Sequence, residues 1–280
     1  MERFLKPCYR GFLSKFKLPR DVCFSLFKRR LNKFLVVSRR DCPCYMLLDG
    51  KDHYAINVLK RGKIESPEDE FLKKIVQKRW KILDIGAHWG GFTLLFAHLV
   101  GKEGKVHSVE ASPINYRLLV KNICLNRFRN RVKTYNLAAG DKNGEVELLL
   151  AKTSSGHNTV LNSRTDLPVK ERIKVPLRRL DDIFPNEVFN LIKIDIEGFE
   201  YFALKGLEKV IGRSSPLWLF IEFSPQFMDS KLTQKLERFL TDHFEEIYLA
   251  HRKRVFKTDF ETAFKISKEK GQRNLFLFKP

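Results

Sequence analysis

From residue 81 onward, short apolar segments alternate with longer amphipathic ones, and this alternation limits the folds open to the chain. The apolar segments predict strands over 81–85, 105–110, 132–138, 191–196, 217–223, 246–250 and 274–278. The segments between them predict helices over 91–100, 113–126, 200–211 and 231–241. Short apolar strands separated by helices form parallel sheets that helices cover on both faces. The sequence therefore predicts an α/β fold with a mostly parallel seven-stranded sheet.

One stretch, residues 139–190, interrupts this alternation because it contains no clear helical pattern. Strands are predicted over 145–151 and 173–177, with a polar loop at 152–168 between them. We interpret the stretch as an inserted β-meander. Loops of that length are usually functional or disordered. His157 in the loop is therefore a candidate general base, although a histidine in a loop is more often only solvated.

The 280-residue chain has a net charge of +20, and the basic excess lies mostly at its ends. We divide the chain into a basic N-terminal extension, residues 1–64, and an α/β domain, residues 65–280. Within the extension, residues 45–60 predict a short hairpin around an Asp-Gly turn. At the start of the domain, Ser66 and Pro67 predict a helix that runs to about Lys78.

Residues 21–36 predict one amphipathic basic helix within the extension. The helix would either pack on the main domain or bring residues 1–40 into contact with an anionic membrane or a lipid-linked substrate. The longest apolar runs are far shorter than the roughly 20 residues of a membrane span. The first residues also lack the pattern of a secretory signal. We therefore expect a cytoplasmic protein, either free or peripheral to a membrane.

The strand at 81–85 contains Asp84 and leads into a turn with Gly86, Ala87, His88 and Gly90. Glycines at two places in such a turn let the backbone bend sharply and approach a ligand closely. The spacing is not the GxGxxG of dinucleotide-binding folds, and no Lys-Ser/Thr pair follows as in a phosphate-binding loop. Gly86-x-x-x-Gly90 preceded by Asp84 instead resembles motif I of Rossmann-like, S-adenosylmethionine-dependent methyltransferases.

Glu110 ends the next predicted strand. An acid at this place in an α/β sheet accepts hydrogen bonds from the two hydroxyls of a ribose. The alternative role is capping of the following helix, since Pro113 stands just beyond it.

Several acids follow the predicted strands at 191–196 and 217–223, where ligands bind in open α/β sheets. Asp195, Glu197 and Glu200 lie within six residues, and Glu222 ends the neighbouring strand. These carboxylates are candidates for a general base, or for ligands of a divalent metal that acidifies a hydroxyl. The alternative is helix capping by Glu197 and Glu200. Lys193 could pair with one of the acids.

Four segments together resemble the FkbM family of methyltransferases: 84–90, 110–113, 136–141 and 193–200. The resemblance implies a Rossmann-like class I methyltransferase fold, with S-adenosylmethionine as methyl donor. It implies cofactor contacts for Asp84, Gly86, Ala87, His88, Gly90, Glu110, Ala138 and Asp141, the last beside the adenine. It implies catalytic roles for Asp195, Glu197 and Glu222. The chain departs from the family at His88, where Asn is usual, and at Ala111, where Pro is usual.

The family resemblance favours an O-methyltransferase that acts on a hydroxyl of a sugar, glycan, lipid-linked glycan or polyketide-like acceptor. An RNA methyltransferase is an alternative because of the charge, but no RNA-binding motif is present, so nucleic acid is not an expected partner. A second alternative is a non-catalytic, cofactor-binding basic module. The carboxylates could bind a divalent metal, but the sequence does not predict one.

Overall fold

The computed structural model describes residues 34–38, 42–56, 66–161, 167–251 and 254–280. Most of the predicted amphipathic helix, and with it the predicted membrane contact of residues 1–40, lies outside these ranges. The helix was predicted to reach residue 36, and this is wrong because Phe34–Ser38 forms a strand, β1. A short apolar run such as 34–37 fits a helix or a strand equally well.

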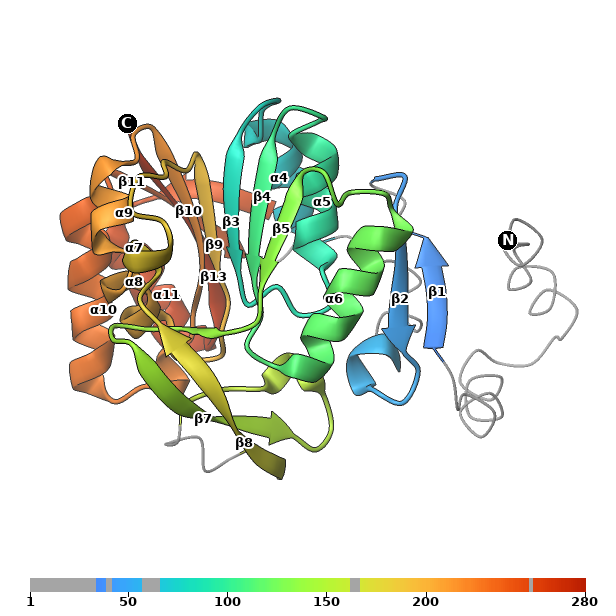
Figure 1. Ribbon diagram of the computed structural model, residues 1–280. Helices are drawn as coiled ribbons and strands as arrows, with labels where there is room; N and C mark the ends of the chain where they lie inside the picture. Colours follow the sequence, from blue (N-terminus) through green and yellow to red (C-terminus); the bar gives the residue numbers. More distant parts are fainter. Residues whose placement is uncertain (1–33, 39–41, 57–65, 162–166, 252–253) are drawn as a thin grey trace, which may run out of the picture.

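The central sheet has eight strands in the described residues, ordered β12-β11-β13-β10-β9-β3-β4-β5. The parallel strands are β3 (Lys81–Ile85), β4 (Lys105–Val109), β5 (Val132–Tyr135), β9 (Leu191–Ile194) and β10 (Leu217–Phe223). The antiparallel part contains β13 (Arg273–Lys279), β11 (Glu246–His251) and β12 (Arg254–Thr258). The Rossmann-like α/β fold is thus confirmed (Figure 1).

The predicted number of seven strands is wrong, because β12 adds an eighth strand at the sheet edge. Its residues are mostly exposed and mix charged with apolar side chains, so no apolar run marks the strand. The following helix, α11 (Phe260–Lys270), was also not predicted.

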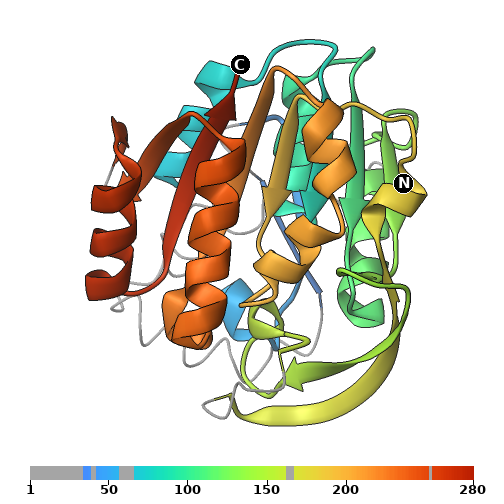
Figure 2. The same cartoon turned by 90° about the vertical axis from the view of Figure 1, so that its left-hand side faces the viewer.

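Two hydrophobic cores cover the two faces of the sheet, as the pleat of a strand requires. Ile82 of β3 and Phe220 of β10 point into a core with α4 (Pro67–Ile75), α5 (Gly91–Leu99) and α6 (Pro113–Leu125). Leu83 and Leu219, the residues adjacent to them in the two strands, point into the opposite core. That core holds α8 (Glu200–Lys205), α9 (Glu208–Arg213), α10 (Ser230–His243) and α11, which Figure 2 shows in front of the sheet. A short helix, α7 (Leu180–Ile183), joins the same side.

The helix predicted over 200–211 is broken into α8 and α9 at Gly206. A Cβ atom at this glycine would lie 1.9 Å from the carbonyl oxygen of Gly140. Only glycine permits this close approach of two backbone segments. The helix predicted from Ser66 does begin there, with a capping box between Ser66 and Asp69, but it ends at Ile75 rather than Lys78.

The insertion forms a separate three-stranded sheet across the carboxyl ends of the parallel strands (Figure 1). It contains β6 (Ala138–Ala139), β7 (Gly144–Ala151) and β8 (Val169–Arg178), in the order β6-β8-β7. The predicted meander is wrong in its connectivity, since β6 pairs with β8 in parallel. Only β7 and β8 form an antiparallel hairpin, and the 3₁₀ turn η2 (Ser155–His157) lies in the connection between them.

The hairpin predicted over 45–60 is also wrong. The strand β2 (Tyr45–Asp49) pairs with β1 before it, and the Asp49–Gly50 turn leads into helical residues 53–56. Met46 and Leu48 of β2 are fully buried in the core that contains α5 and α6. Part of the predicted extension 1–64 therefore contributes to the core of the domain.

Asn122 of α6 and Asn126, the C-cap of that helix, hold the free edge of β2, which lies beside α6 in Figure 1. Asn122 accepts a hydrogen bond from the N–H of Leu47 (2.6 Å) and donates to its carbonyl (3.1 Å). Asn126 makes the same pair of bonds with Tyr45. Four residues of helix rise about 6 Å and two residues of strand about 6.6 Å, so the two spacings match. The helix thereby replaces a neighbouring strand.

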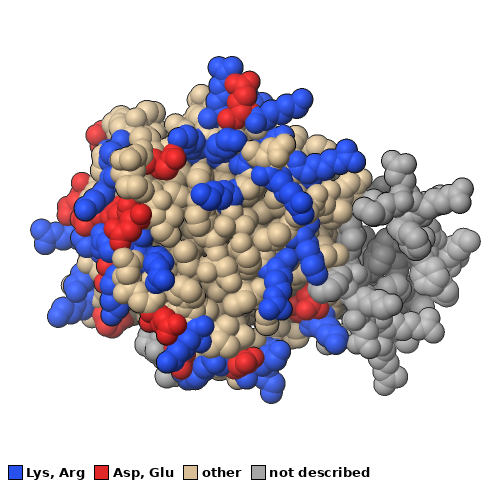
Figure 3. Space-filling model, in the orientation of Figure 1, with Lys and Arg blue, Asp and Glu red and all other residues tan. Residues whose placement is uncertain are grey.

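On the face shown in Figure 3, Lys and Arg side chains are spread around the rim and mixed with Asp and Glu. The centre of this face consists of other residue types. No helix in the described residues is both long enough and apolar enough to span a membrane.

We predict that Asn122→Ala lowers the free energy of unfolding by about 2–3 kcal/mol, because buried backbone groups of Leu47 and Trp89 lose their partner. Asn126→Ala should lower it by less than about 1 kcal/mol, because water replaces its exposed bonds with Tyr45. Urea denaturation followed by circular dichroism measures both. Equal losses would contradict the role given to Asn122.

Candidate active site

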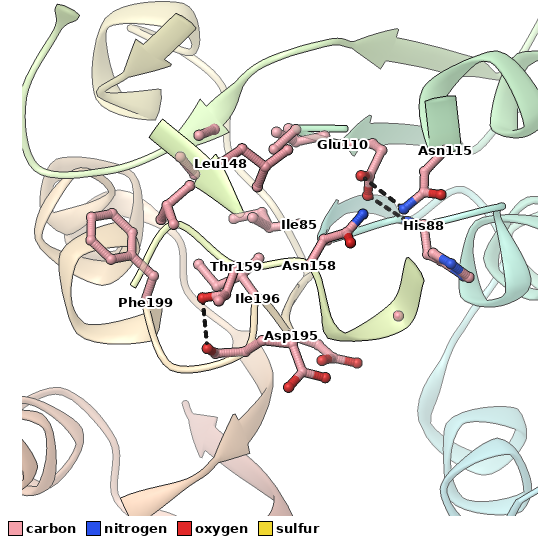
Figure 4. A pocket seen from close by; sticks show the side chains of 18 of the residues that line it. Ile85, His88, Glu110, Asn115, Leu148, Asn158, Thr159, Asp195, Ile196 and Phe199 are labelled. Carbon is pink, nitrogen blue, oxygen red and sulfur yellow. Dashed lines mark hydrogen bonds between the residues drawn. The ribbon is translucent and has the colours of Figure 1, made fainter. Parts of the chain in front are cut away.

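A pocket opens at the carboxyl ends of β3, β4 and β9, beneath the inserted sheet. It encloses about 550 Å³ including its open mouth. Figure 4 shows Glu110, Asn115 and His88 at one end of the pocket, Phe199 at the other, and Asp195 on a separate wall. A mostly apolar lining with a few convergent polar groups is typical of a small-molecule site.

Gly86 forms the floor of the pocket, where the ends of β3 and β9 meet. Its φ is +76°, and a Cβ atom here would lie 1.8 Å from the carbonyl oxygen of Asp195. The N–H groups of Gly86 and Ala87 donate to the carbonyl of Val109 at the end of β4. The turn therefore ties three strand ends together, and a side chain at Gly86 would force them apart. Gly90 ends the turn in the left-handed conformation and caps α5.

Asp84 does not line the pocket. It is fully buried, accepts a hydrogen bond from the Thr93 hydroxyl (2.6 Å) and lies 3.5 Å from the ammonium nitrogen of Lys193. Lys193 is buried as well, and its nitrogen is also 3.5 Å from Asp195. Burial lowers the pKa of Lys193, but the carboxylates of Asp195 and Asp84 outweigh it, so that the pKa is raised and the lysine stays charged. Asp84 therefore acts on the site through Lys193.

Glu110 lines the pocket and also contacts the start of the next helix, whose N-cap is Ser112. Its carboxylate accepts from the N–H of His88 (2.8 Å), the N–H of Ser112 (2.9 Å) and the side-chain amide of Asn115 (3.5 Å). Burial raises the pKa of Glu110 to about 7, although the bonds from Ser112 and His88 oppose the shift. The capping alternative is not observed, because the Ser112 hydroxyl caps α6, and the ribose role stays a prediction.

His88 stands in the left-handed region with a φ of 51°. Its ring stacks on Trp89, and its Nε2 is 2.7 Å from the Ser155 hydroxyl. Burial and the charge of Lys193 lower the pKa of His88 to about 3, so the ring is neutral at physiological pH. The ring fixes η2 of the insertion over the pocket.

Ala138 lines the pocket beside Ala139, but Asp141 is not among the lining residues. The Asp141 carbonyl instead accepts a hydrogen bond from the guanidinium of Arg179 (2.7 Å). The structure therefore does not bring Asp141 to the place predicted for adenine. His157 of the insertion is likewise not a lining residue of this pocket.

Asp195, Glu197 and Glu222 converge, as predicted from the strand ends. Each offers a carboxylate oxygen, and these oxygens lie within 4.8 Å of one another. The prediction assumed an extended strand, but β9 ends at Ile194 and Glu197 has a φ of 59°. A turn thus brings the carboxylates together. We name these three residues the acidic cluster.

Glu222 and Glu200 are deeply buried members of this region. Glu200 accepts from the N–H groups of Ile196 and Gly198 (both 3.1 Å), which lie in the turn before α8. The capping role considered for Glu197 and Glu200 is not observed, because the N-cap of α8 is Phe199 and no side chain caps the helix. Burial raises the pKa of Glu200 to about 7. Glu222 accepts a hydrogen bond from the Gln272 side chain, and burial followed by the charge of Asp195 raises its pKa well above the usual value.

A second, more polar hollow of about 810 Å³, including its open side, lies next to Glu222. Its lining residues come from α4, β10, β11 and the start of β13: Glu68, Glu222, Ala250, His251, Gln272, Arg273 and Asn274. Asp195 and Glu197 line the first pocket, whereas Glu222 lines the second. The acidic cluster therefore stands between two hollows.

Sequence reasoning missed several pocket residues of the insertion. Ser155 donates its N–H to Asp52 (2.8 Å), and its carbonyl accepts from Asn115 (3.2 Å). The Thr159 hydroxyl donates to the carbonyl of Glu197 (2.9 Å). The sequence feature that could have pointed to these residues is the polar loop at 152–168. It indicated a functional segment, but not that its residues line this pocket.

Residues 84–256, more than half of the chain, match the family described as the methyltransferase FkbM domain. The chain is therefore a methyltransferase-domain protein and belongs to this family. The resemblance read from the sequence is thus confirmed.

A curated relative is the methyltransferase sdnD of Sordaria araneosa, 26% identical over 157 residues. The match covers 46% of this chain and 60% of the relative, so the chain covers less than two thirds of that protein's length. Similar solved structures include methyltransferase FkbM from Methylobacillus flagellatus, with 18% identity, a TM-score of 0.49, and coverage of 92% of this chain and 58% of that one. The O-methyltransferase from Bacillus cereus in complex with SAH has 15% identity, a TM-score of 0.47, and coverage of 96% of both chains.

We predict that Glu110→Gln changes the pH dependence of stability in the ligand-free protein. The pKa of Glu110 is raised from 4.5 to about 7 by folding, so its contribution to stability is full below pH 4.5 and is lost as pH rises through 7. Between pH 5 and 8 the variant should gain stability relative to wild type, by up to roughly 3 kcal/mol at about 1.4 kcal/mol per pKa unit.

Urea denaturation at several pH values measures this difference. Glu145→Gln, which removes the same charge from an exposed site, is the matched control and should follow the wild-type curve. A stability difference between Glu110→Gln and wild type that does not change with pH would contradict the prediction.

Proposed function

We propose that this protein is an S-adenosylmethionine-dependent O-methyltransferase. Its acceptor would be a hydroxyl of a sugar, glycan, lipid-linked glycan or polyketide-like molecule. The observation that carries the proposal is the position of the acidic cluster, between the pocket at Gly86 and Glu110 and the polar hollow beside Glu222. A methyl donor bound in the pocket and a hydroxyl acceptor bound in the polar hollow would come together beside the carboxylates of the acidic cluster.

The residues of the first pocket fit S-adenosylmethionine. Gly86 lines the pocket with backbone alone, and Glu110 offers a carboxylate for ribose hydroxyls. Apolar residues such as Ala138 and Leu148 would face the adenine. When bound, the cofactor supplies a methyl group already activated on a sulfonium.

The acidic cluster would supply the base. Methyl transfer to an alcohol requires a group that accepts the hydroxyl proton. Asp195 is the best-placed candidate, because it is partly exposed and lines the donor pocket. Lys193 holds it by an ion pair from the buried side, which fixes the orientation of the carboxylate. Positioning of donor and acceptor provides much of the rate enhancement in such a reaction.

We predict that the wild-type protein binds S-adenosylmethionine in calorimetry and that Gly86→Ala weakens this binding at least about tenfold. A methyl at Gly86 meets the Asp195 carbonyl, so the turn must shift away from its ligand-binding geometry. Glu110→Gln should also weaken binding, because it removes the charge that accepts from the ribose. The matched control Glu145→Gln should bind like wild type. No binding by the folded wild-type protein would sink the proposed cofactor.

We predict that Asp195→Asn lowers transfer of a labelled methyl group to hydroxylated glycans and lipids by about 10²–10⁴-fold, the usual contribution of a general base. Binding of S-adenosylmethionine should change less than about threefold, since the amide keeps the shape of the side chain. Undiminished transfer by Asp195→Asn would exclude Asp195 as the base. Transfer to nitrogen acceptors alone would exclude the proposed acceptor class.

A further inference from the structure

The acidic cluster has the geometry of a cation site. Oxygens that bind one ion at 2.0–2.6 Å can be no further apart than about 4–5 Å, twice that distance. The cluster oxygens meet this limit, since they lie within 4.8 Å of one another. All donors are carboxylate oxygens, which suit hard cations such as Mg²⁺, Mn²⁺ and Ca²⁺.

An independent observation points to a missing ligand at Glu222. The residue is only 5% exposed, and its Oε1 accepts a hydrogen bond from Gln272. Its other oxygen, Oε2, is buried without a hydrogen-bond partner. In the described ranges no Lys or Arg nitrogen forms an ion pair with Glu222. A buried carboxylate oxygen without a partner is strongly unfavourable, and a bound cation removes that penalty.

The charges around the cluster favour the same conclusion. The ammonium of Lys193 lies 3.5 Å from Asp195, but it also serves Asp84 at the same distance. The positive charge of Lys193 is thus already shared between two carboxylates, and Glu222 is a further carboxylate nearby. Desolvated carboxylates at short range repel one another unless a positive charge stands between them.

We propose that Asp195, Glu197 and Glu222 bind one divalent cation of the Mg²⁺ or Mn²⁺ class, between the two hollows. The three carboxylates would supply three ligands, and water or the acceptor would complete the coordination. The binding site stands on the geometry of the cluster and on the unpartnered oxygen of Glu222, and is independent of the proposed function. The role of the cation in catalysis rests on the proposed O-methyltransferase function.

In that role the cation would bind the acceptor hydroxyl and lower its pKa. The O–H bond breaks and its proton passes to a carboxylate oxygen or to water. The alkoxide electron pair forms the new O–CH₃ bond while the S–CH₃ bond breaks and its pair stays on sulfur. The products are a methyl ether, S-adenosylhomocysteine and a proton, and no further reactant is needed.

Manganese binding to the full-length protein tests the site. The wild-type protein is first stripped of metal with a chelator. Electron paramagnetic resonance of free Mn²⁺ then measures binding, and we expect one Mn²⁺ bound per chain. Mg²⁺ should compete for the same site. Asp195→Asn and Glu222→Gln should each weaken Mn²⁺ binding about 10–100-fold, because each removes one charged ligand. Glu110→Gln, which changes a buried carboxylate of the same pocket outside the cluster, should bind Mn²⁺ like wild type.

The outcomes separate the cation site from the proposed function. No binding of Mn²⁺ or Mg²⁺ at millimolar concentration by the folded wild type overturns the site, and so does equal binding by all variants. If Glu222→Gln fails to fold, the partly exposed Asp195 gives the deciding variant. Wild type that binds Mn²⁺ at the cluster but transfers no methyl group supports the site while the proposed function fails. Full transfer in excess chelator would remove the catalytic role of the cation.

Discussion

The site depends on the ion pairs made by the buried ammonium of Lys193. It lies 3.5 Å from Asp84 on the neighbouring strand and 3.5 Å from Asp195 at the end of its own strand. A lysine that is 1% exposed is tolerable only with such partners. Because Asp84 is held in turn by Thr93 of α5, the charge of Asp195 is connected to the helix that follows the Gly86 turn. The turn at Gly86 and the acidic cluster are therefore parts of one buried polar network.

The inserted sheet closes this network from the opposite side. Ser155 joins His88 through its hydroxyl, Asn115 through its carbonyl and Asp52 through its N–H. Thr159 holds the backbone of Glu197, whose left-handed conformation directs its carboxylate into the cluster. The insertion thus fixes residues that belong to the parallel sheet. A loop without these contacts would leave the turn after β9 free to adopt an ordinary extended conformation.

The parallel strands could be predicted because each is an apolar run, and the motif residues follow from where those strands end. The eighth strand β12 escaped prediction because an exposed edge strand carries charged residues. Asp84 was assigned to the cofactor because sequence reveals its strand but not the Thr93 and Lys193 partners that occupy it. Asp141 was placed by the family pattern, whereas Arg179 holds its backbone away from the pocket. Contacts between residues more than sixty positions apart, such as His88 with Ser155, have no local signal.

The topology explains why the acidic cluster can serve two hollows. The strand β13 runs antiparallel to β10, so its first residues lie at the carboxyl end of β10, with Asn274 opposite Glu222. Gln272, just before that strand, therefore reaches the Glu222 carboxylate, and Asn274 reaches Glu68 at the start of α4. Parallel strands place only their carboxyl ends at this edge of the sheet. The antiparallel β13 adds the polar side chains of its first residues to the same edge. The antiparallel direction of β13 thus builds the second hollow, and Glu222 connects that hollow, through the acidic cluster, to the pocket at Gly86.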